Sequence, residues 1–325
     1  MADDTPSRGG AKAASGVVGL LIGGLAAAFV LRTLLRDREE IGDALAGASA
    51  GWLVLGFALA AVGMTAIALP WRRALNLLHA DLPVGQLVAR YYVGEIGKYL
   101  PGGVWPILGR GELARRHGVR RAAAYGSVAL SLVALYLGAM FVVGAGLPAL
   151  LAGGDGTGPI AVLLLLPLGV GCLHPAVIGG AITLVERVAK RRLDLAVPTW
   201  RASVTLVCLY VPAWLAIGAA TWAVARALDP SADLTEVGVA AVLSWVVGFV
   251  LVPVPGGVGV REAAFVAAAG SLDPGIAAAT ALATRVLFVA VDALGAAIGS
   301  VALRRAREPD QPDQPDQPAW TVDEA

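Results

Sequence analysis

Long runs of apolar residues, separated by short charged segments, cover most of the chain. A helix needs about 20 apolar residues to cross the hydrocarbon core of a bilayer. Six segments meet this requirement, namely residues 16–35, 46–69, 122–150, 159–185, 202–228 and 275–303. The pattern therefore predicts an all-α polytopic membrane protein with about six full spans.

Two further apolar segments, residues 84–108 and 237–270, are each interrupted by a Pro-Gly-Gly sequence. The first interruption reads YLPGGVW and the second reads VPVPGGVG. Proline removes a backbone donor and clashes with the preceding turn, and glycine lowers helix propensity further. We predict that both segments are broken, re-entrant hairpins, because non-helical backbone at membrane depth persists only where protein or a wet cavity covers it.

Lysines and arginines concentrate in alternate loops. With a cytoplasmic N-terminus and hairpins that return to their own side, the inner segments are 1–15, 70–83, 109–121, 186–201 and 304–325. They carry seventeen lysines and arginines, whereas the predicted outer loops carry only Arg36 and Arg38. The positive-inside rule then places both termini in the cytoplasm.

This topology divides the chain into two halves of opposite orientation. The predicted parts are a cytoplasmic segment (1–15), a first membrane repeat (16–150, hairpin 84–108), a second membrane repeat (151–303, hairpin 237–270) and a disordered cytoplasmic tail (304–325). Hairpins in inverted repeats would bring their Pro-Gly-Gly loops together near the bilayer midplane, where many secondary transporters bind their substrates.

Composition agrees with a membrane protein. Hydrophobic residues make up 57% of the chain and charged residues 15%, whereas a soluble domain has about 25% charged residues. The net charge of +1 gives no indication of a nucleic-acid partner. Cys172 and Cys208 each lie alone in an apolar run, which predicts buried side chains and no metal site. No cofactor is expected.

Charged residues inside membrane segments are costly, so each is a candidate functional residue. Glu95 and Lys98 are three residues apart before the first break, and they either form a structural ion pair or Lys98 helps to hold an anionic headgroup. Arg110 and Glu112 follow the first break, and Arg110 alternatively binds lipid phosphates at the interface. The pair Arg261–Glu262 follows the second break.

A helix that starts after each break would favour an anion, because its first N–H groups are free and its dipole end is positive. Glycine lets the backbone approach a ligand, and arginine binds phosphate through two N–H groups. Each glutamate would accept from an amine or a sugar hydroxyl, or cap the helix and neutralise the arginine. The candidate headgroup-binding residues are Glu95, Lys98, Pro101, Gly102, Gly103, Arg110, Glu112, Pro255, Gly256, Gly257, Gly259, Arg261, Glu262 and Arg285.

Other polar and aromatic residues have structural interpretations. Arg285 and Asp292 lie seven residues apart in the last apolar segment and are expected to point into the protein, where they would bridge to other spans. His174 beside Pro175 marks a kink, with a proton relay as the alternative. Aromatic residues expected as interface anchors are Trp52, Tyr91, Tyr92, Trp105 and Trp245. The sequence GAAIG (295–299) predicts a close helix–helix contact.

The segments GEIGKYLPGGVWPILGR (94–110) and VPVPGGVGVREAA (252–264) resemble the two signatures of the lysylphosphatidylglycerol synthase transmembrane-region family, which are flippase-like integral membrane proteins. The resemblance extends from the first span to Arg304. It implies a multi-pass protein of the bacterial cytoplasmic membrane that handles a lipid or a lipid-linked headgroup. The stretch GSVALSLV (126–133) lacks the Glu-Arg pair often found there in the family, so no role is carried over for that span.

The leading hypothesis is a flippase or scramblase whose partner is a membrane lipid. One alternative is a membrane-embedded lipid-phosphate transferase that uses Glu262 or Glu112 as its base. Another is a non-transporting accessory subunit of an envelope glycosyltransferase or synthase. The sequence shows no nucleotide-binding loop or catalytic constellation, so no enzymatic activity is expected. The larger relatives carry a soluble synthetase domain, and its absence here implies no synthetase activity. Lipid identity, coupling ion and oligomeric state stay open.

Overall fold

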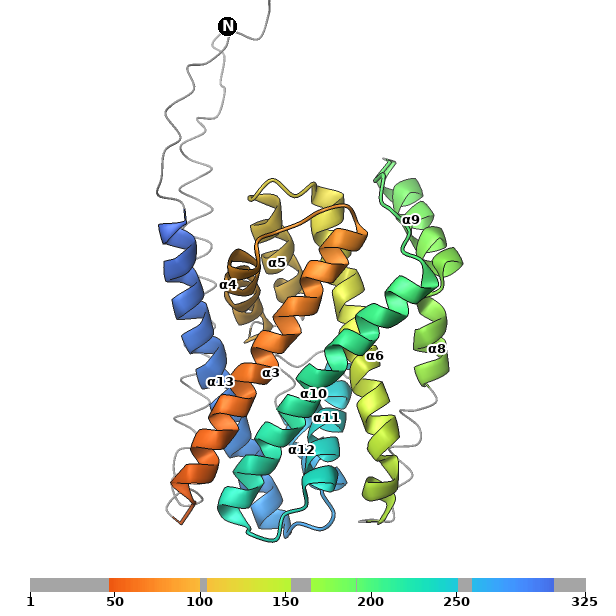
Figure 1. The fold of residues 1–325 in the computed structure, drawn as a ribbon. Helices are drawn as coiled ribbons and strands as arrows, with labels where there is room; N and C mark the ends of the chain where they lie inside the picture. The colour runs from red at the N-terminus through yellow and green to blue at the C-terminus, as the bar shows by residue number, and fades with distance from the viewer. Residues whose placement is uncertain (1–46, 100–103, 153–164, 191, 251–258, 307–325) are drawn as a thin grey trace, which may run out of the picture.

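The computed structural model describes residues 47–99, 104–152, 165–190, 192–250 and 259–306. Within these ranges every regular element is a helix (Figure 1). Four of the described helices are long and apolar enough to cross a membrane. They are α3 (Ala50–Leu77), α6 (Arg121–Ala152), α10 (Trp200–Leu228) and α13 (Pro274–Arg305). The chain is therefore an α-helical protein with several candidate membrane spans.

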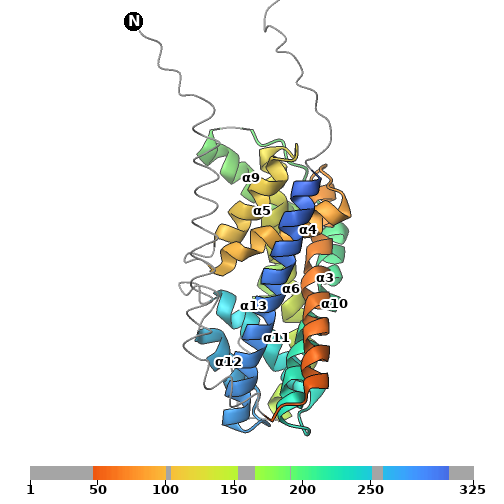
Figure 2. The same cartoon turned by 90° about the vertical axis from the view of Figure 1, so that its left-hand side faces the viewer.

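Shorter helices flank the two Pro-Gly-Gly breaks. Before and after the first break lie α4 (Val84–Glu95) with the 3₁₀ turn η1 (Ile96–Tyr99), and α5 (Trp105–Arg115). The second break lies between α11 (Leu234–Val250) and α12 (Val260–Ala268). The helices of each pair pack against one another. Figure 2 shows α4 and α5 along one half of the bundle's length, and α11 and α12 along the other half.

Four of the six predicted spans match the long helices, with shifts at their ends. The predicted span 16–35 lies outside the described residues. The predicted span 159–185 is not one continuous helix in its described part, because α8 (Leu165–Cys172) ends before α9 begins (Pro175–Ala189). Proline lacks an N–H donor but suits the first turn of a new helix. The structure thus does not confirm six spans.

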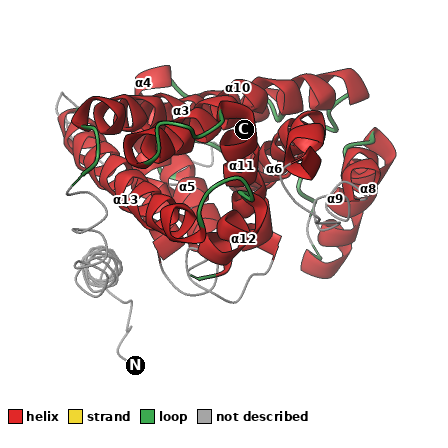
Figure 3. Cartoon of the chain, turned by 90° about the horizontal axis from the view of Figure 1, so that it is seen from below, coloured by secondary structure: helices red, strands yellow, loops and turns green. Residues whose placement is uncertain are grey.

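The break before α9 gives His174 a structural role. His174 is the N-cap of α9, and its Nδ1 accepts a hydrogen bond from the backbone N–H of Ala176 at 3.3 Å. Such a cap satisfies one of the free donors at a helix start. In the view along the bundle (Figure 3), α8 and α9 lie at the edge of the bundle beside α6. This position does not favour a proton relay at His174.

Glycines let the long helices approach closely, as the GAAIG sequence predicts. A Cβ atom added to Gly299 would lie 2.9 Å from the backbone oxygen of Ala89 on α4. A Cβ atom at Gly218 of α10 would lie 2.8 Å from the backbone oxygen of Gly238 on α11. Both distances are shorter than side-chain contacts allow, so α13 and α10 each touch a neighbouring helix through backbone.

Both cysteines are exposed in the part of the chain that the structure describes. The prediction of buried cysteines is therefore wrong for Cys172 and Cys208. An apolar run crossing a bilayer has a lipid-facing side as well as a core-facing side, and sequence does not separate them where both are apolar.

Many arginines gather at one end of the bundle, and several aspartates lie at the other. The ends of α3 and α13 lie together with the starts of α4 and α10 (Figure 1). Arginines of this end include Arg72, Arg73, Arg115, Arg116, Arg120, Arg121, Arg201, Arg304 and Arg305. The opposite end has the acidic residues Asp229, Asp233 and Asp273 between its helices. From the positive-inside rule we predict that this basic end faces the cytoplasm.

Cysteine labelling tests this orientation. In a background with Cys172→Ala and Cys208→Ala, we expect an impermeant maleimide to label Ser231→Cys in intact cells. We expect His117→Cys, at the basic end, to react only after the cells are permeabilised. Both positions are exposed, so access to the reagent reports sidedness. Labelling of His117→Cys but not Ser231→Cys in intact cells would reverse the orientation.

Candidate functional site

A cavity of about 310 Å³ lies between the helices that flank the two breaks. Volumes of roughly 300–1,000 Å³ are usual for small-ligand sites. The charged residues of its lining are Glu95, Lys98, Arg110, Arg261, Arg285 and Asp292. The aromatic residues of its lining are Tyr91, Tyr99, Tyr136, Trp214, Trp245, Phe249 and Phe288. The cavity thus brings together residues that follow α4 and residues that follow α11, although more than 150 positions separate Lys98 from Arg261.

Lys98 lies between two carboxylates from different helices. Its Nζ is 4.0 Å from Glu95 Oε2 and 2.6 Å from Asp292 Oδ2. The predicted proximity of Glu95 and Lys98 is present, but the closer partner of Lys98 is Asp292 on α13. This contact joins the end of α4 to the last long helix.

Arg110 is held inside the protein by Glu95 and two aromatic rings. Its Nε lies 3.3 Å from Glu95 Oε1, and its guanidinium lies 5.9 Å from the Trp71 ring and 5.3 Å from the Tyr91 ring. A Cβ atom at Gly94 would lie 2.9 Å from the backbone N of Arg110, so glycine is needed for this approach of α5 to α4. Arg110 is only 1% exposed, which does not favour a position among interfacial lipid phosphates.

Asp292 is fully buried, and it binds two residues that directly precede the first break, Lys98 and Tyr99. Its Oδ2 accepts a hydrogen bond of 2.6 Å from the Tyr99 hydroxyl and also contacts Lys98. Its Oδ1 has no hydrogen-bond partner among the described residues, and neither has Lys98 Nζ, whose contact with Oδ2 is an ion pair. A buried oxygen without a donor is costly, so a ligand or water that donates to it would be stabilised there.

Glu262 closes the start of α12 and links it to α13. Gly259, at φ +81°, precedes the helix, and its N–H donates to Glu262 Oε2 at 2.6 Å. This is the glutamate half of a capping box. The other carboxylate oxygen of Glu262 accepts a hydrogen bond from Arg285. Glu262 therefore has the capping role that the sequence offered as one alternative, and its arginine partner is Arg285.

Arg261 differs from the other cations of the cavity. Its Cζ lies 3.5 Å from the centre of the Trp245 ring and 5.7 Å from that of Phe288, so it is held by cation–π contacts. Lys98, Arg110 and Arg285 each have a carboxylate partner, whereas Arg261 makes no ion pair among the described residues. The break loops 100–103 and 251–258 contain no acidic residue that would supply one.

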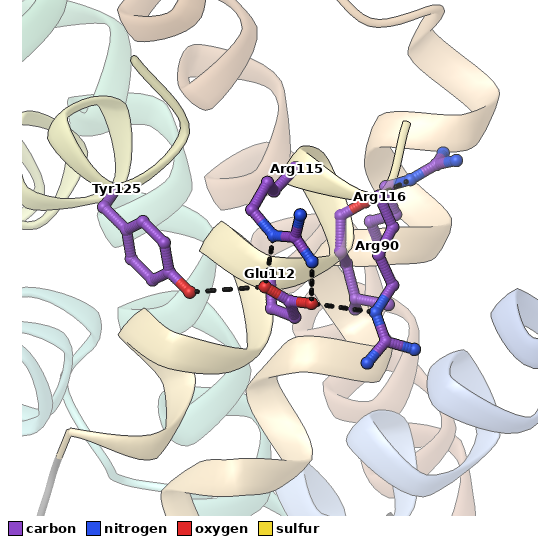
Figure 4. Close-up of polar contacts among 6 residues, drawn as sticks. Arg90, Glu112, Arg115, Arg116 and Tyr125 are labelled. Carbon is purple, nitrogen blue, oxygen red and sulfur yellow. Dashed lines mark hydrogen bonds and ion pairs between the residues drawn. The ribbon is translucent and has the colours of Figure 1, made fainter. Parts of the chain in front are cut away.

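Glu112 lies outside the cavity lining, at the basic end of the bundle. Figure 4 shows its carboxylate between Arg115 and Arg116, at 2.8 and 3.0 Å. The Tyr125 hydroxyl donates to it at 3.5 Å, and Arg90 lies nearby with its guanidinium bonded to the backbone of α5. The hydrogen bond from Arg115, more than that from Arg116, lowers the pKa of Glu112 to about 2. Glu112 is therefore an ion-pair partner of surface arginines.

Six predicted site residues lie outside the described residues, namely Pro101, Gly102, Gly103, Pro255, Gly256 and Gly257. Among the described ones, the structure places Glu95, Lys98, Arg110, Arg261 and Arg285 in one cavity lining, with Glu262 bound to Arg285 and Gly259 bound to Glu262.

The sequence analysis missed the aromatic lining. Trp245 lines the cavity, and Tyr91 and Tyr92 are almost fully buried, so these three are not interface anchors. One part of the lining could have been recognised in the sequence of α13, because residues three, four and seven positions apart lie on one face of a helix. The residues of this face are Arg285, Phe288, Val289 and Asp292.

The fold and the cavity define an α-helical multi-pass membrane protein with a charged, aromatic-lined internal site. The chain belongs to the lysylphosphatidylglycerol synthase transmembrane-region family, whose model matches residues 16–299. The resemblance seen in the two break segments is thereby confirmed. A comparison with curated proteins found no match.

Proposed function

We propose that this protein binds the polar headgroup of a lipid or lipid-linked molecule in the cavity and translocates it across the membrane. The observation that carries the proposal is Arg261, a cation in the cavity lining without an ion pair among the described residues. A guanidinium on an aromatic ring keeps its planar N–H donors available to an anion. Phosphate is the anion that polar lipids present at the boundary between headgroup and chains.

The arrangement of the helices supports a translocation path. We propose that α4–α5 and α11–α12 are re-entrant hairpins that enter from opposite sides in two inverted repeats. Each pair occupies its own half of the bundle (Figure 2). Rocking of one half against the other would then open the shared cavity to either side, as in transporters with inverted repeats.

The geometry does not favour a transferase. Both glutamates considered as its base are already engaged, Glu112 by two arginines and Glu262 by Arg285 and the start of α12. A carboxylate that is held by arginine is a poor proton acceptor, because the positive charge stabilises the ionised form.

Transport by the purified protein tests the function. Vesicles containing the protein and trace lipid with a fluorescent headgroup are treated with an impermeant quencher. We expect the fraction of lipid that the quencher reaches to rise from about half to nearly all, at a rate that increases with protein density. The same lipid recovered by mass spectrometry should be chemically unchanged. A rate equal to that of empty vesicles would contradict transport, and a new lipid product would favour the transferase.

The second break supplies a variant for the same assay. We expect Gly256→Ala with Gly257→Ala to slow transport, because each replacement favours continuous helix by roughly 1 kcal/mol and so opposes the break. Insertion should not change, since the segment stays equally apolar. Gly85→Ala is the matched control, because a Cβ atom there meets nothing within 4 Å and the residue lies outside the cavity lining. Unaltered transport by the double variant would show that the break is not a working part.

A further inference from the structure

The charges around the cavity do not cancel. In the described lining the cations are Lys98, Arg110, Arg261 and Arg285, and the carboxylates are Glu95 and Asp292. Glu262, bound to Arg285, adds a third carboxylate beside the lining. The balance is therefore one positive charge, and Arg261 is the group that carries it. A low-polarity surrounding strengthens its attraction to a single negative charge.

The three carboxylates are poor partners for a ligand amine. Glu95 lies 3.3 Å from Arg110, Asp292 lies 2.6 Å from Lys98, and Glu262 binds Arg285. An ammonium group brought to any of them would meet the arginine or lysine that already neutralises it. Like charges placed together in an interface oppose binding.

A hydroxyl group meets no such opposition. Asp292 lines the cavity, and its Oδ1 is buried without a hydrogen-bond partner among the described residues, so a hydroxyl reaches this oxygen when the lining opens around it. A neutral hydroxyl can donate to this oxygen without adding charge next to Lys98. A donor to a charged acceptor is stabilised by roughly 1.5–3 kcal/mol, which is about tenfold or more in affinity.

We infer that the cavity takes a phosphodiester with one negative charge whose headgroup carries hydroxyl groups and no amine. This inference rests on the proposed function and gives its substrate class. The phosphate binds Arg261, the hydroxyls reach Asp292, and the aromatic rings around Trp245 cover the apolar parts of the headgroup. An aminoacylated lipid, which brings extra positive charge, is disfavoured.

Binding of defined lipids tests the inference. The purified full-length protein in a neutral detergent is titrated with dioctanoyl lipids, and bound lipid is measured by native mass spectrometry. The probes are phosphatidylglycerol, its lysine ester, phosphatidylethanol, which keeps the phosphodiester but lacks hydroxyls, and soluble glycerol 3-phosphate. We expect phosphatidylglycerol to bind about tenfold more tightly than phosphatidylethanol and at least about tenfold more tightly than the lysine ester. Glycerol 3-phosphate should bind most weakly, because it lacks chains.

A matched pair of variants assigns the binding to the cavity. Arg261→Gln should lower the affinity for phosphatidylglycerol about tenfold or more. Arg226→Gln is the control, because Arg226 also lies over tryptophan rings, 5.5 Å from Trp52 and 6.0 Å from Trp222, but outside the cavity lining. It should leave the affinity unchanged. Arg261→Lys should restore part of the affinity, which separates loss of charge from loss of fold.

The outcomes separate the inference from the proposed function. If the lysine ester binds as tightly as phosphatidylglycerol and Arg261→Gln weakens both, the substrate class is wrong and the function stands. If phosphatidylethanol binds as tightly as phosphatidylglycerol, the inferred contact between the headgroup hydroxyls and Asp292 is wrong. If no lipid binds, or if Arg261→Gln changes nothing, the proposed function fails with the inference. If glycerol 3-phosphate binds as tightly as the lipid, the site serves a soluble phosphate and the lipid assignment fails.

Discussion

Replacing Arg261 with glutamate is expected to abolish transport, while the protein still inserts into the membrane. The new carboxylate would stand where we propose that the phosphate binds, and it would reverse the unbalanced positive charge of the described cavity lining. Arg261→Lys keeps the charge but loses the planar pair of donors, so it should retain part of the activity. The measurement is the rate of lipid movement in vesicles at equal protein density, with Arg226→Gln as the control. Full transport by Arg261→Glu would remove Arg261 from the mechanism.

Exchanging Arg261 and Glu262 gives a sharper form of this experiment. Had the two residues formed a simple ion pair, the exchange would be tolerated. In the structure, Glu262 caps α12 at Gly259 and binds Arg285. An arginine at position 262 would lose the cap and would repel Arg285, and a glutamate at position 261 would face the cavity. We expect loss of both transport and thermal stability, and an active exchanged variant would contradict these assignments.

Lys98→Met is expected to destabilise the fold by roughly 3–5 kcal/mol, because it leaves the fully buried Asp292 without its cation. Asp292→Asn in the same chain should restore most of the loss, since the neutral amide has no charge to compensate and its oxygen still accepts from Tyr99. The measurement is unfolding in mixed detergent micelles for the parent, both single variants and the double variant.

The control for this cycle is an ion pair at the surface. Arg72 Nε lies 2.9 Å from Asp81 Oδ1, and both side chains are largely exposed, so Arg72→Met should have little effect on unfolding. If the losses of stability from Lys98→Met and Asp292→Asn simply add in the double variant, the two buried residues are not coupled. A loss from Arg72→Met as large as that from Lys98→Met would show that the method measures general damage.

Much of the helical framework was predictable because membrane spans are long apolar runs. Four such runs became α3, α6, α10 and α13, and the segments around the breaks became paired shorter helices. The placement of Arg285 and Asp292 inside the protein was also predictable, because a charge facing lipid is costly. The span at 159–185 failed because hydropathy does not register a helix start at Pro175.

The pairing within the site was harder to predict. Glu262 binds Arg285 from 23 positions away, and Lys98 binds Asp292 across most of the chain, so neither contact has a local signature. Local spacing did contain the partners of Glu112, since Arg115 and Arg116 follow it at three and four positions. Trp245 was misassigned because a tryptophan in an apolar run suits either a membrane interface or a cavity wall.

The contact between Arg261 and a tryptophan ring affects how fast a ligand can bind and leave. A buried carboxylate would have to be separated from the guanidinium before each ligand bound, and it would reclaim the guanidinium as each ligand left. A ring contact of about 0.5–2 kcal/mol orients the cation without competing for its N–H donors. Loading and unloading then require no exchange of ion partners. In the function that we propose, the residence time of the lipid would be set by the lipid's own contacts, which suits a transporter because it must release every molecule that it binds.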